Sequence, residues 1–192
     1  MLETNHSLSQ EEEWQVNEMK ALLLNERGNQ DEFLPIWYKL LKQYREADKP
    51  EEVGKCLLTI ASHFVMLEDY DNALPLYKEA YQLAVEHEFV DLQKSSGIML
   101  VKYLCGAGDY SKSLEYYNKI NPEIALVPSM QNEVVKSYME LNKPDSARIY
   151  LAERLLLEGG DKIFLNCMMA ETYIPEGQED SAFIFLDRAM ES

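Results

Sequence analysis

The chain is poor in positive charge. It carries 18 Lys and Arg against 34 Asp and Glu among 192 residues, a formal net charge of −16. Contacts with nucleic-acid phosphates need clustered Lys and Arg, and anionic membrane surfaces attract the same residues. The balance therefore argues against a nucleic-acid binder or a membrane-docking protein acting through this segment. A solvated acidic outer face accounts for the surplus more simply than an acidic binding groove.

Cysteine and histidine are also scarce, with three of each. An odd number of widely spaced cysteines argues against a disulfide framework and against a zinc site. Each cysteine lies in an apolar helical pattern typical of a small core residue. This usage fits the cytoplasm, with the periplasm left open if a signal segment has been removed. The histidines form no His-Glu-x-x-His motif, and neighbouring side chains in Glu86-His87-Glu88 would point to different helix faces. We predict no metal and no cofactor.

Long apolar runs and catalytic motifs are missing as well. No stretch approaches the roughly 18 apolar residues of a membrane helix, and residues 1–14 lack the pattern of a signal peptide. There is no Gly-rich phosphate loop after a strand and no Gly-x-Ser-x-Gly elbow. Acidic runs such as Glu11-Glu12-Glu13 are explained by the helix dipole. We therefore predict that the chain is not an enzyme, with a helical-toroid enzyme as the weakest alternative.

What the sequence does contain is an internal repeat. Residues 69–80 read DYDNALPLYKEA, and residues 109–120 read DYSKSLEYYNKI. Weaker copies cover residues 144–151 and 179–186, and a degenerate copy includes Phe33. One position of each copy, here called the anchor, is small in four of the five. The anchors are Phe33, Ala73, Ser113, Ala147 and Ala182, at spacings of 40, 40, 34 and 35 residues.

Other positions recur in step with the anchors. Four residues after them come Trp37, Tyr77, Tyr117, Leu151 and Leu186. Nine residues before them come Leu24, Phe64, Leu104, Tyr138 and Tyr173. Three residues before those come Ala21, Ala61, Val101, Val135 and Ala170. Small and bulky residues three or four apart share one helix face, so each copy predicts two helices that approach closely and must stack on neighbouring pairs.

The sequence thus predicts an all-α array of about five helical hairpins spanning residues 1–192. The hairpins are expected at residues 10–48, 50–88, 90–121, 127–159 and 161–191. Helix boundaries are indicated by a capping box at Ser9 and Glu12, Gly28, Pro50, Asp161 and Pro175, which should end a helix at about Ile174. Breaks are expected at Asn121-Pro122 and Gly159-Gly160. The two spacings of 40 predict longer helices.

At these residues the chain resembles the tetratricopeptide repeat family. The family signature is a small residue followed four positions later by Phe or Tyr and preceded by Gly-Asp-Tyr or a variant. Gly108-Asp109-Tyr110 matches fully and Glu68-Asp69-Tyr70 nearly, although the family's Trp and Leu-Gly pair on the first helix is largely missing. The resemblance covers roughly residues 8–190. It implies a right-handed superhelical solenoid whose first helices line a concave, partner-binding face.

The family pattern places candidate binding residues on the first helices. The positions are Lys55, Leu58, Ser62 and Val65, then Ser95, Ile98, Lys102 and Cys105, then Ser129, Asn132, Lys136 and Met139. Lys55, Lys102 and Lys136 form a stripe that could hold a peptide carboxylate or an acidic side chain, although ordinary solvated lysines explain it equally well. The Lys and Asn set with which some family members clamp a chaperone C-terminus is not present.

The last predicted helix suggests a second surface. Phe183, Phe185 and Met190 would leave apolar area exposed unless something covers it, and such patches mark interfaces. Either this chain is a fragment of a longer protein that continues with further repeats, or two copies form a homodimer through this end. We favour the first alternative, because the sequence stops at Met190-Glu191-Ser192 without a solvating helix.

The expected function is a non-catalytic protein–protein or peptide-binding scaffold. The Asp-Ser-Ala form of the repeat resembles bacterial arrays, so the module could be the interaction or sensing part of a bacterial regulator. The alternative is an intracellular receptor for a small signalling peptide. The partner in either case is a protein or peptide.

Overall fold

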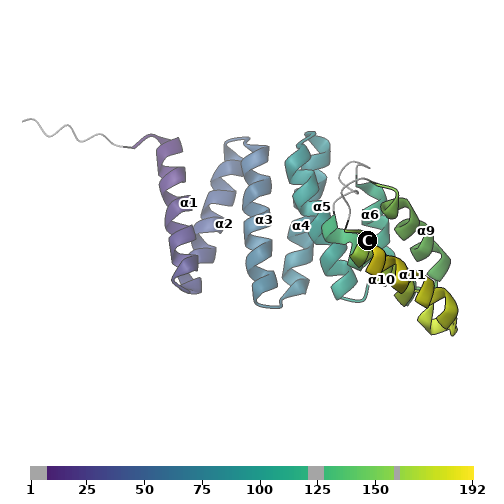
Figure 1. The fold of residues 1–192 in the computed structure, drawn as a ribbon. Coiled ribbons are helices and arrows are strands. Elements are labelled where there is room, and N and C mark those ends of the chain that lie inside the picture. Colours follow the sequence, from purple (N-terminus) through teal and green to yellow (C-terminus); the bar gives the residue numbers. More distant parts are fainter. Residues whose placement is uncertain (1–7, 121–127, 158–160) are drawn as a thin grey trace, which may run out of the picture. The chain divides into compact units, whose positions relative to one another are not determined.

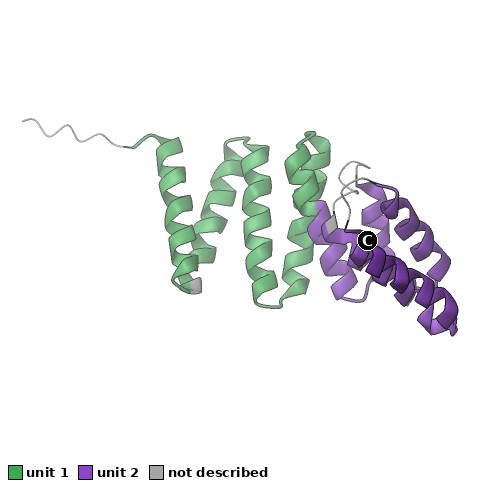
Figure 2. Ribbon diagram, in the orientation of Figure 1, with its two compact units in different colours: residues 1–96 green, residues 97–192 purple. Residues whose placement is uncertain are grey.

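The computed structural model describes residues 8–120, 128–157 and 161–192. All regular secondary structure in these residues is helical (Figure 1), which confirms the predicted all-α helical-repeat class. The chain divides into two compact units, residues 1–96 and 97–192 (Figure 2).

Unit 1 is built from long helices of equal length. Its helices are α1 (Gln10–Glu26), α2 (Gln30–Glu46), α3 (Pro50–Met66), α4 (Tyr70–Glu86) and the first part of α5 (Val90–Gly106). Each of the five spans 17 residues. Helices consecutive in the sequence pack on one another, α1 on α2, α2 on α3 and α3 on α4. The repeat spacing of 40 residues therefore reflects longer helices, as predicted.

The helices α1 to α5 end in the same way at 20-residue intervals. A residue in the left-handed region follows each helix: Gly28, Asp48, Glu68, Glu88 and Gly108. The amide one residue later donates to a carbonyl five positions back, as Asn29 does to Leu24 (2.9 Å). This hydrogen bond is the Schellman motif, which satisfies carbonyls left free at a helix end. Three of these five positions hold acidic residues, so composition alone does not reveal the turn.

Unit 2 has shorter helices. After the end of α5 come α6 (Tyr110–Lys119), the 3₁₀ helix η1 (Pro128–Met130), α8 (Gln131–Glu140), α9 (Pro144–Leu155), α10 (Lys162–Glu171), the 3₁₀ helix η2 (Ile174–Glu176) and α11 (Glu179–Glu191). The α-helices after α5 span 10 to 13 residues, and α6, α8, α9, α10 and α11 pack in that order. The breaks expected at Asn121-Pro122 and Gly159-Gly160 lie outside the described residues.

The five anchors all lie in the interior. Phe33 is 2% exposed and Ala182 6%, and the other three are fully buried. The small residues of the first helices, from Ala21 to Ala170, are buried as well. Leu186 departs from the pattern because it is exposed on α11. Every anchor is therefore buried as the sequence predicts, but at Ala182 the bulky residue four positions later is exposed.

Most predicted helix boundaries agree with the structure. Ser9 and Glu12 form the capping box of α1, with the Glu12 amide donating to Ser9 Oγ at 3.3 Å and the Ser9 amide to Glu12 Oε2 at 2.7 Å. Asp161 caps α10 through the Phe164 amide at 3.0 Å. The end expected at Ile174 is wrong by three residues, because α10 stops at Glu171 and a separate 3₁₀ turn holds Pro175. No helix within the described ranges has the length and hydrophobicity needed to cross a bilayer.

Candidate binding site

Hollows lie between the first helices of successive hairpins in both units. In unit 1 one hollow lies between α1 and α3, and another between α3 and the start of α5. In unit 2 one lies between the end of α5 and α8, and another between α8 and α10. We call the surface made by these helices the first-helix face. It is the surface on which the repeat pattern places candidate binding residues.

The α5/α8 hollow is the most cationic of these. Its lining residues are Lys102, Cys105, Gly106, Asn132, Glu133 and Lys136. Lys102 is half-buried and Lys136 exposed, and neither forms an ion pair with another described residue. The Glu133 carboxylate in the same hollow offsets one of the two charges. The two ammonium groups, beside the Asn132 amide, can hold a further carboxylate by charge-assisted hydrogen bonds.

Cys105 differs from its predicted position. The family pattern treats it as an exposed groove residue, but it is only 2% exposed and belongs to the floor of the α5/α8 hollow. Burial raises the pKa of its thiol, and the charge of Lys136 acts in the opposite direction. At neutral pH the residue is therefore a neutral packing group rather than a nucleophile.

The α8/α10 hollow is lined by both apolar and polar side chains. Its volume is about 430 Å³, and it shares Asn132 and Lys136 with the α5/α8 hollow. The remaining lining residues are Val135, Met139, Met168, Glu171 and Thr172. Methionine side chains adapt their shape to different apolar partners. A cationic subsite and a subsite lined by methionines thus lie next to each other in unit 2.

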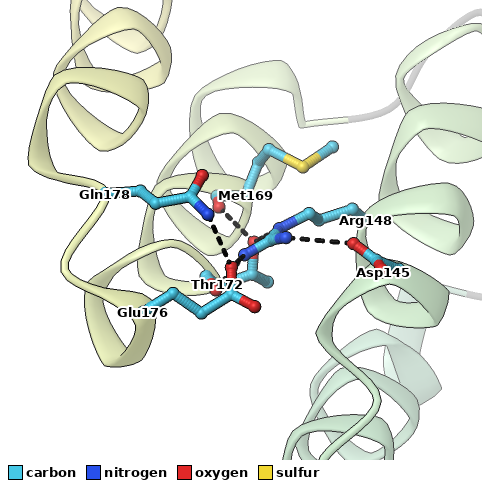
Figure 3. Close-up of polar contacts among 6 residues, drawn as sticks. All are labelled: Asp145, Arg148, Met169, Thr172, Glu176 and Gln178. Carbon is cyan, nitrogen blue, oxygen red and sulfur yellow. Dashed lines mark hydrogen bonds and ion pairs between the residues drawn. The ribbon is translucent and has the colours of Figure 1, made fainter.

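A clasp centred on Arg148 fixes one end of the α8/α10 hollow (Figure 3). Arg148, on α9, donates to the Thr172 carbonyl at 2.7 Å and to Thr172 Oγ1 at 3.2 Å. It also pairs with Asp145 and Glu176, and its guanidinium lies 3.9 Å from the Tyr173 ring centroid. Since Thr172 lines the hollow, the clasp holds that wall in place. The repeat pattern does not single out Arg148, which stands one residue after the anchor Ala147.

In unit 1, the α3/α5 hollow contains Lys55, Leu58 and Ser95 from the predicted set. The Lys55 ammonium lies 2.7 Å from the carboxylate of Glu51, one turn earlier on α3. Its charge is therefore compensated within the helix, unlike that of Lys102 and Lys136. The predicted stripe therefore contains one lysine that is ion-paired within its own helix, Lys55, and two that form no ion pair with another described residue, Lys102 and Lys136.

The α1/α3 hollow is acidic and was not predicted. Glu18 and Glu52 line it and are half-buried, and no described cation pairs with either. The Tyr44 hydroxyl donates to Glu18 at 2.9 Å, and burial together with this hydrogen bond raises the pKa of Tyr44. Burial and the same two carboxylates raise the pKa of Cys56 to about 12. Glu11, Lys49 and Lys55 also line the hollow, and Lys49 pairs with Glu11, so the lining has only a small excess of negative charge.

The remaining predicted residues lie elsewhere. Ser62 is within 3.0 Å of the Tyr77 hydroxyl, Ile98 is half-buried, and neither lines one of these hollows. Phe185 does not share the exposed face of α11, because it stacks on Tyr173 with ring centroids 5.6 Å apart. Phe183 and Met190 are 61% and 79% exposed.

Groups of acidic, histidine and cysteine side chains that could bind a metal ion do not occur among the described residues. His63, which the sequence places beside an apolar stripe, is buried and packs 4.7 Å from the Phe33 ring.

Comparison with known proteins supports the fold. No protein-family model matches the chain, and no curated protein matches it. Among solved structures it is similar to BtubC (BKLC) from P. vanneervenii, with a TM-score of 0.68 and 16% identity. The match covers 91% of this chain and 77% of that chain. At this identity the likeness concerns the all-helical fold alone.

Proposed function

We propose that the chain is a non-catalytic module that binds an extended segment of another polypeptide along the first-helix face of unit 2. The observation that carries this proposal is the adjacency of the α5/α8 and α8/α10 hollows, which share Asn132 and Lys136. One hollow offers two lysines that form no ion pair with another described residue, and the other offers two methionines. A peptide with an acidic residue close to a large apolar residue matches this pair.

The finer assignment is also a proposal. We propose that the hairpins are tetratricopeptide-type repeats, supported by the five buried anchors and by the match of Gly108-Asp109-Tyr110 to the family signature. A place in a bacterial regulator, as its interaction or sensing part, follows from the same resemblance.

The test is peptide display against the intact chain, followed by fluorescence anisotropy with one selected, labelled peptide. We expect selected sequences to pair Asp or Glu with Leu, Met or Phe. Lys102→Glu and Lys136→Glu should each weaken binding by about tenfold, since loss of a charge-assisted contact of ~1.4 kcal/mol gives that factor.

Lys162→Glu is the matched control, because Lys162 is exposed on α10 and lines neither hollow. The Lys162→Glu variant should bind the selected peptide with the same affinity as the unaltered chain. Equal affinity of all three variants, or a selection without acidic residues, would remove the proposed site.

A further inference from the structure

Two exposed apolar faces, one on α1 and one on α11, match the two halves of an interface already present inside the chain. On α1 an apolar hollow of about 440 Å³ is lined by Val16, Met19, Lys20, Leu23, Leu24 and Arg27. On α11 Phe183, Leu186 and Met190 share one helix face, at positions i, i+3 and i+7, and all three are exposed. No described residue covers either face.

The repeat register shows what the α1 face corresponds to. Val16, Lys20 and Leu23 lie 40 residues, one hairpin, before Cys56, Ile60 and His63 of α3. The α3 residues are buried between α3 and α2, where His63 packs against Phe33. The α1 face is thus the surface with which a first helix receives the second helix of a preceding hairpin.

The α11 face corresponds to the other half. Phe183, Leu186 and Met190 follow the anchor Ala182 by one, four and eight residues. The same offsets from Phe33 give Leu34, Trp37 and Leu41 of α2, which are buried or half-buried in the core that α2 shares with α3. The α11 face is therefore the surface with which a second helix meets a following first helix.

Charge decides which faces can meet. The α1 hollow carries Lys20 and Arg27, whereas the α11 stripe is bordered by Asp180 and Asp187. Pairing two α1 faces would bring like positive charges together, and pairing two α11 faces would bring like negative charges together, which is costly. The pairing of α1 with α11 joins opposite charges and also reproduces the contact between a second helix and a following first helix.

We infer that a second copy of this chain docks head to tail, with its α1 face on the α11 face of the first. Such an interface is heterologous, so it leaves one free face at each end and adds further copies. The assembly extends the repeat stacking between molecules by the contacts that stack α2 on α3 within one molecule.

Complementary variants test the geometry. Met19→Asn with Leu23→Asn alters the α1 face, and Phe183→Asn with Met190→Asn alters the α11 face. By sedimentation velocity the unaltered chain should grow in mass with concentration, while each variant alone stays monomeric. An equimolar mixture of the two variants should give a dimer and nothing larger, because one intact face of each kind remains.

Other outcomes overturn the inference. A monomeric unaltered chain at every concentration excludes self-association. The α11 faces of two copies could instead pair symmetrically. In that case the mass stops at a dimer, the α11 variant abolishes this dimer, and the α1 variant still forms it. Met66→Asn and Ile149→Asn are matched controls, since these apolar residues are similarly exposed on other surfaces and should leave association unchanged.

Charge reversal gives a second readout. Lys20→Glu or Asp187→Lys alone should weaken association by about tenfold, and the two changes in one chain should restore it, as expected for charges that meet across an interface. Failure of the double variant to recover would show that these two charges do not face each other.

Discussion

Between neighbouring hairpins, unit 1 buries aromatic rings and has an exposed arginine pair, Arg45 with Glu79. Unit 2 instead uses two largely buried arginines, beside the edge-to-face pair of Tyr117 and Tyr150. In unit 1, α2 and α3 meet where His63 packs on Phe33, beside the buried Trp37. In unit 2, α9 reaches the preceding hairpin through Arg154, which donates to the Tyr117 hydroxyl at 2.6 Å, and the following hairpin through Arg148.

Helix length gives a physical reason for this difference. A helix of 17 residues offers a longer apolar stripe than one of 10 to 13, and burial of apolar area is the main stabilising contribution. The shorter helices of unit 2 have less area to bury, so directional charge-assisted hydrogen bonds supply more of the specificity between hairpins. Hairpins with the same repeat pattern can therefore stack mainly by burying aromatic rings, as in unit 1, or with the help of arginine hydrogen bonds, as in unit 2.

The largest expected effect is the loss of an aromatic side chain in unit 1. Trp37→Ala should lower the free energy of unfolding by ~4 kcal/mol, because it removes a buried ring and leaves a cavity. Urea denaturation measures the loss, and hydrogen exchange of α2 amides locates it. The neighbouring Tyr38 is exposed, so Tyr38→Ala should change stability by less than ~0.5 kcal/mol. Equal effects of the two changes would contradict the role of the aromatic core.

The arginine clasp of unit 2 should give a smaller loss. Arg148→Met keeps the apolar length of the side chain but removes every hydrogen bond to Thr172 and both ion pairs, so we expect a loss of ~2 kcal/mol. Asp145→Asn is the control, because the Asp145 side chain is 89% exposed and such pairs contribute little. Hydrogen exchange should show the loss in α9 and α10. A change confined to α2 and α3 would contradict the comparison.

Substitution by glycine in the turns between helices should raise the stability, unlike the two changes above. Glu68 in unit 1 and Asn142 in unit 2 have φ of 57° and 55°, where glycine is strained less than other residues and Asn less than Glu. Glu68→Gly should therefore stabilise by ~1 kcal/mol, and Asn142→Gly by less. Gly108→Ala, at a φ of 80°, is the reverse control and should destabilise. Melting temperatures give the order of the three.

The smallest expected effect is a loss of stability below pH 6.5 that depends on His63. Burial lowers the pKa of His63 below 6.5, so the unfolded chain binds a proton that the folded chain excludes. The stability of unit 1 should fall as the pH drops from 6.5 toward this lower pKa, and should not change for this reason above 6.5. His63→Phe should reduce the slope of stability against pH in this window. His87→Gln, at an exposed position, should leave the slope unchanged.

Much of the fold follows from spacing alone. The anchors predict which residues are interior, because close helix packing demands small side chains at fixed intervals. Leu186 breaks the pattern, since burial of that position requires a following first helix. The Schellman turns at Asp48, Glu68 and Glu88 were not predicted, because acidic residues give no glycine-like signal. Only the distance of 80 residues between Gly28 and Gly108, four steps of 20, indicates them.

The candidate site was less predictable. The repeat identifies the helices that face a partner, and Lys102, Asn132, Lys136 and Met139 do line hollows. It does not say which charges are already paired: the ion pair of Lys55 with Glu51 depends on rotamers. The clasp of Arg148 joins residues 24 and 28 apart, and the acidic hollow of Glu18 and Glu52 combines two hairpins. Such contacts join residues that are distant in the sequence, so they depend on the tertiary structure and cannot be read from the repeat spacing.

The equal 20-residue interval between the turns of α1 to α5 has a further consequence for how such a chain can change in length. Deletion of residues 50–89 would join the Schellman turn after α2 directly to Val90, where α5 begins, without a new loop. Duplication of the same block would be equally neutral for local geometry. Genetic insertions and losses of 40 codons are therefore the edits that this part of the protein is best able to tolerate.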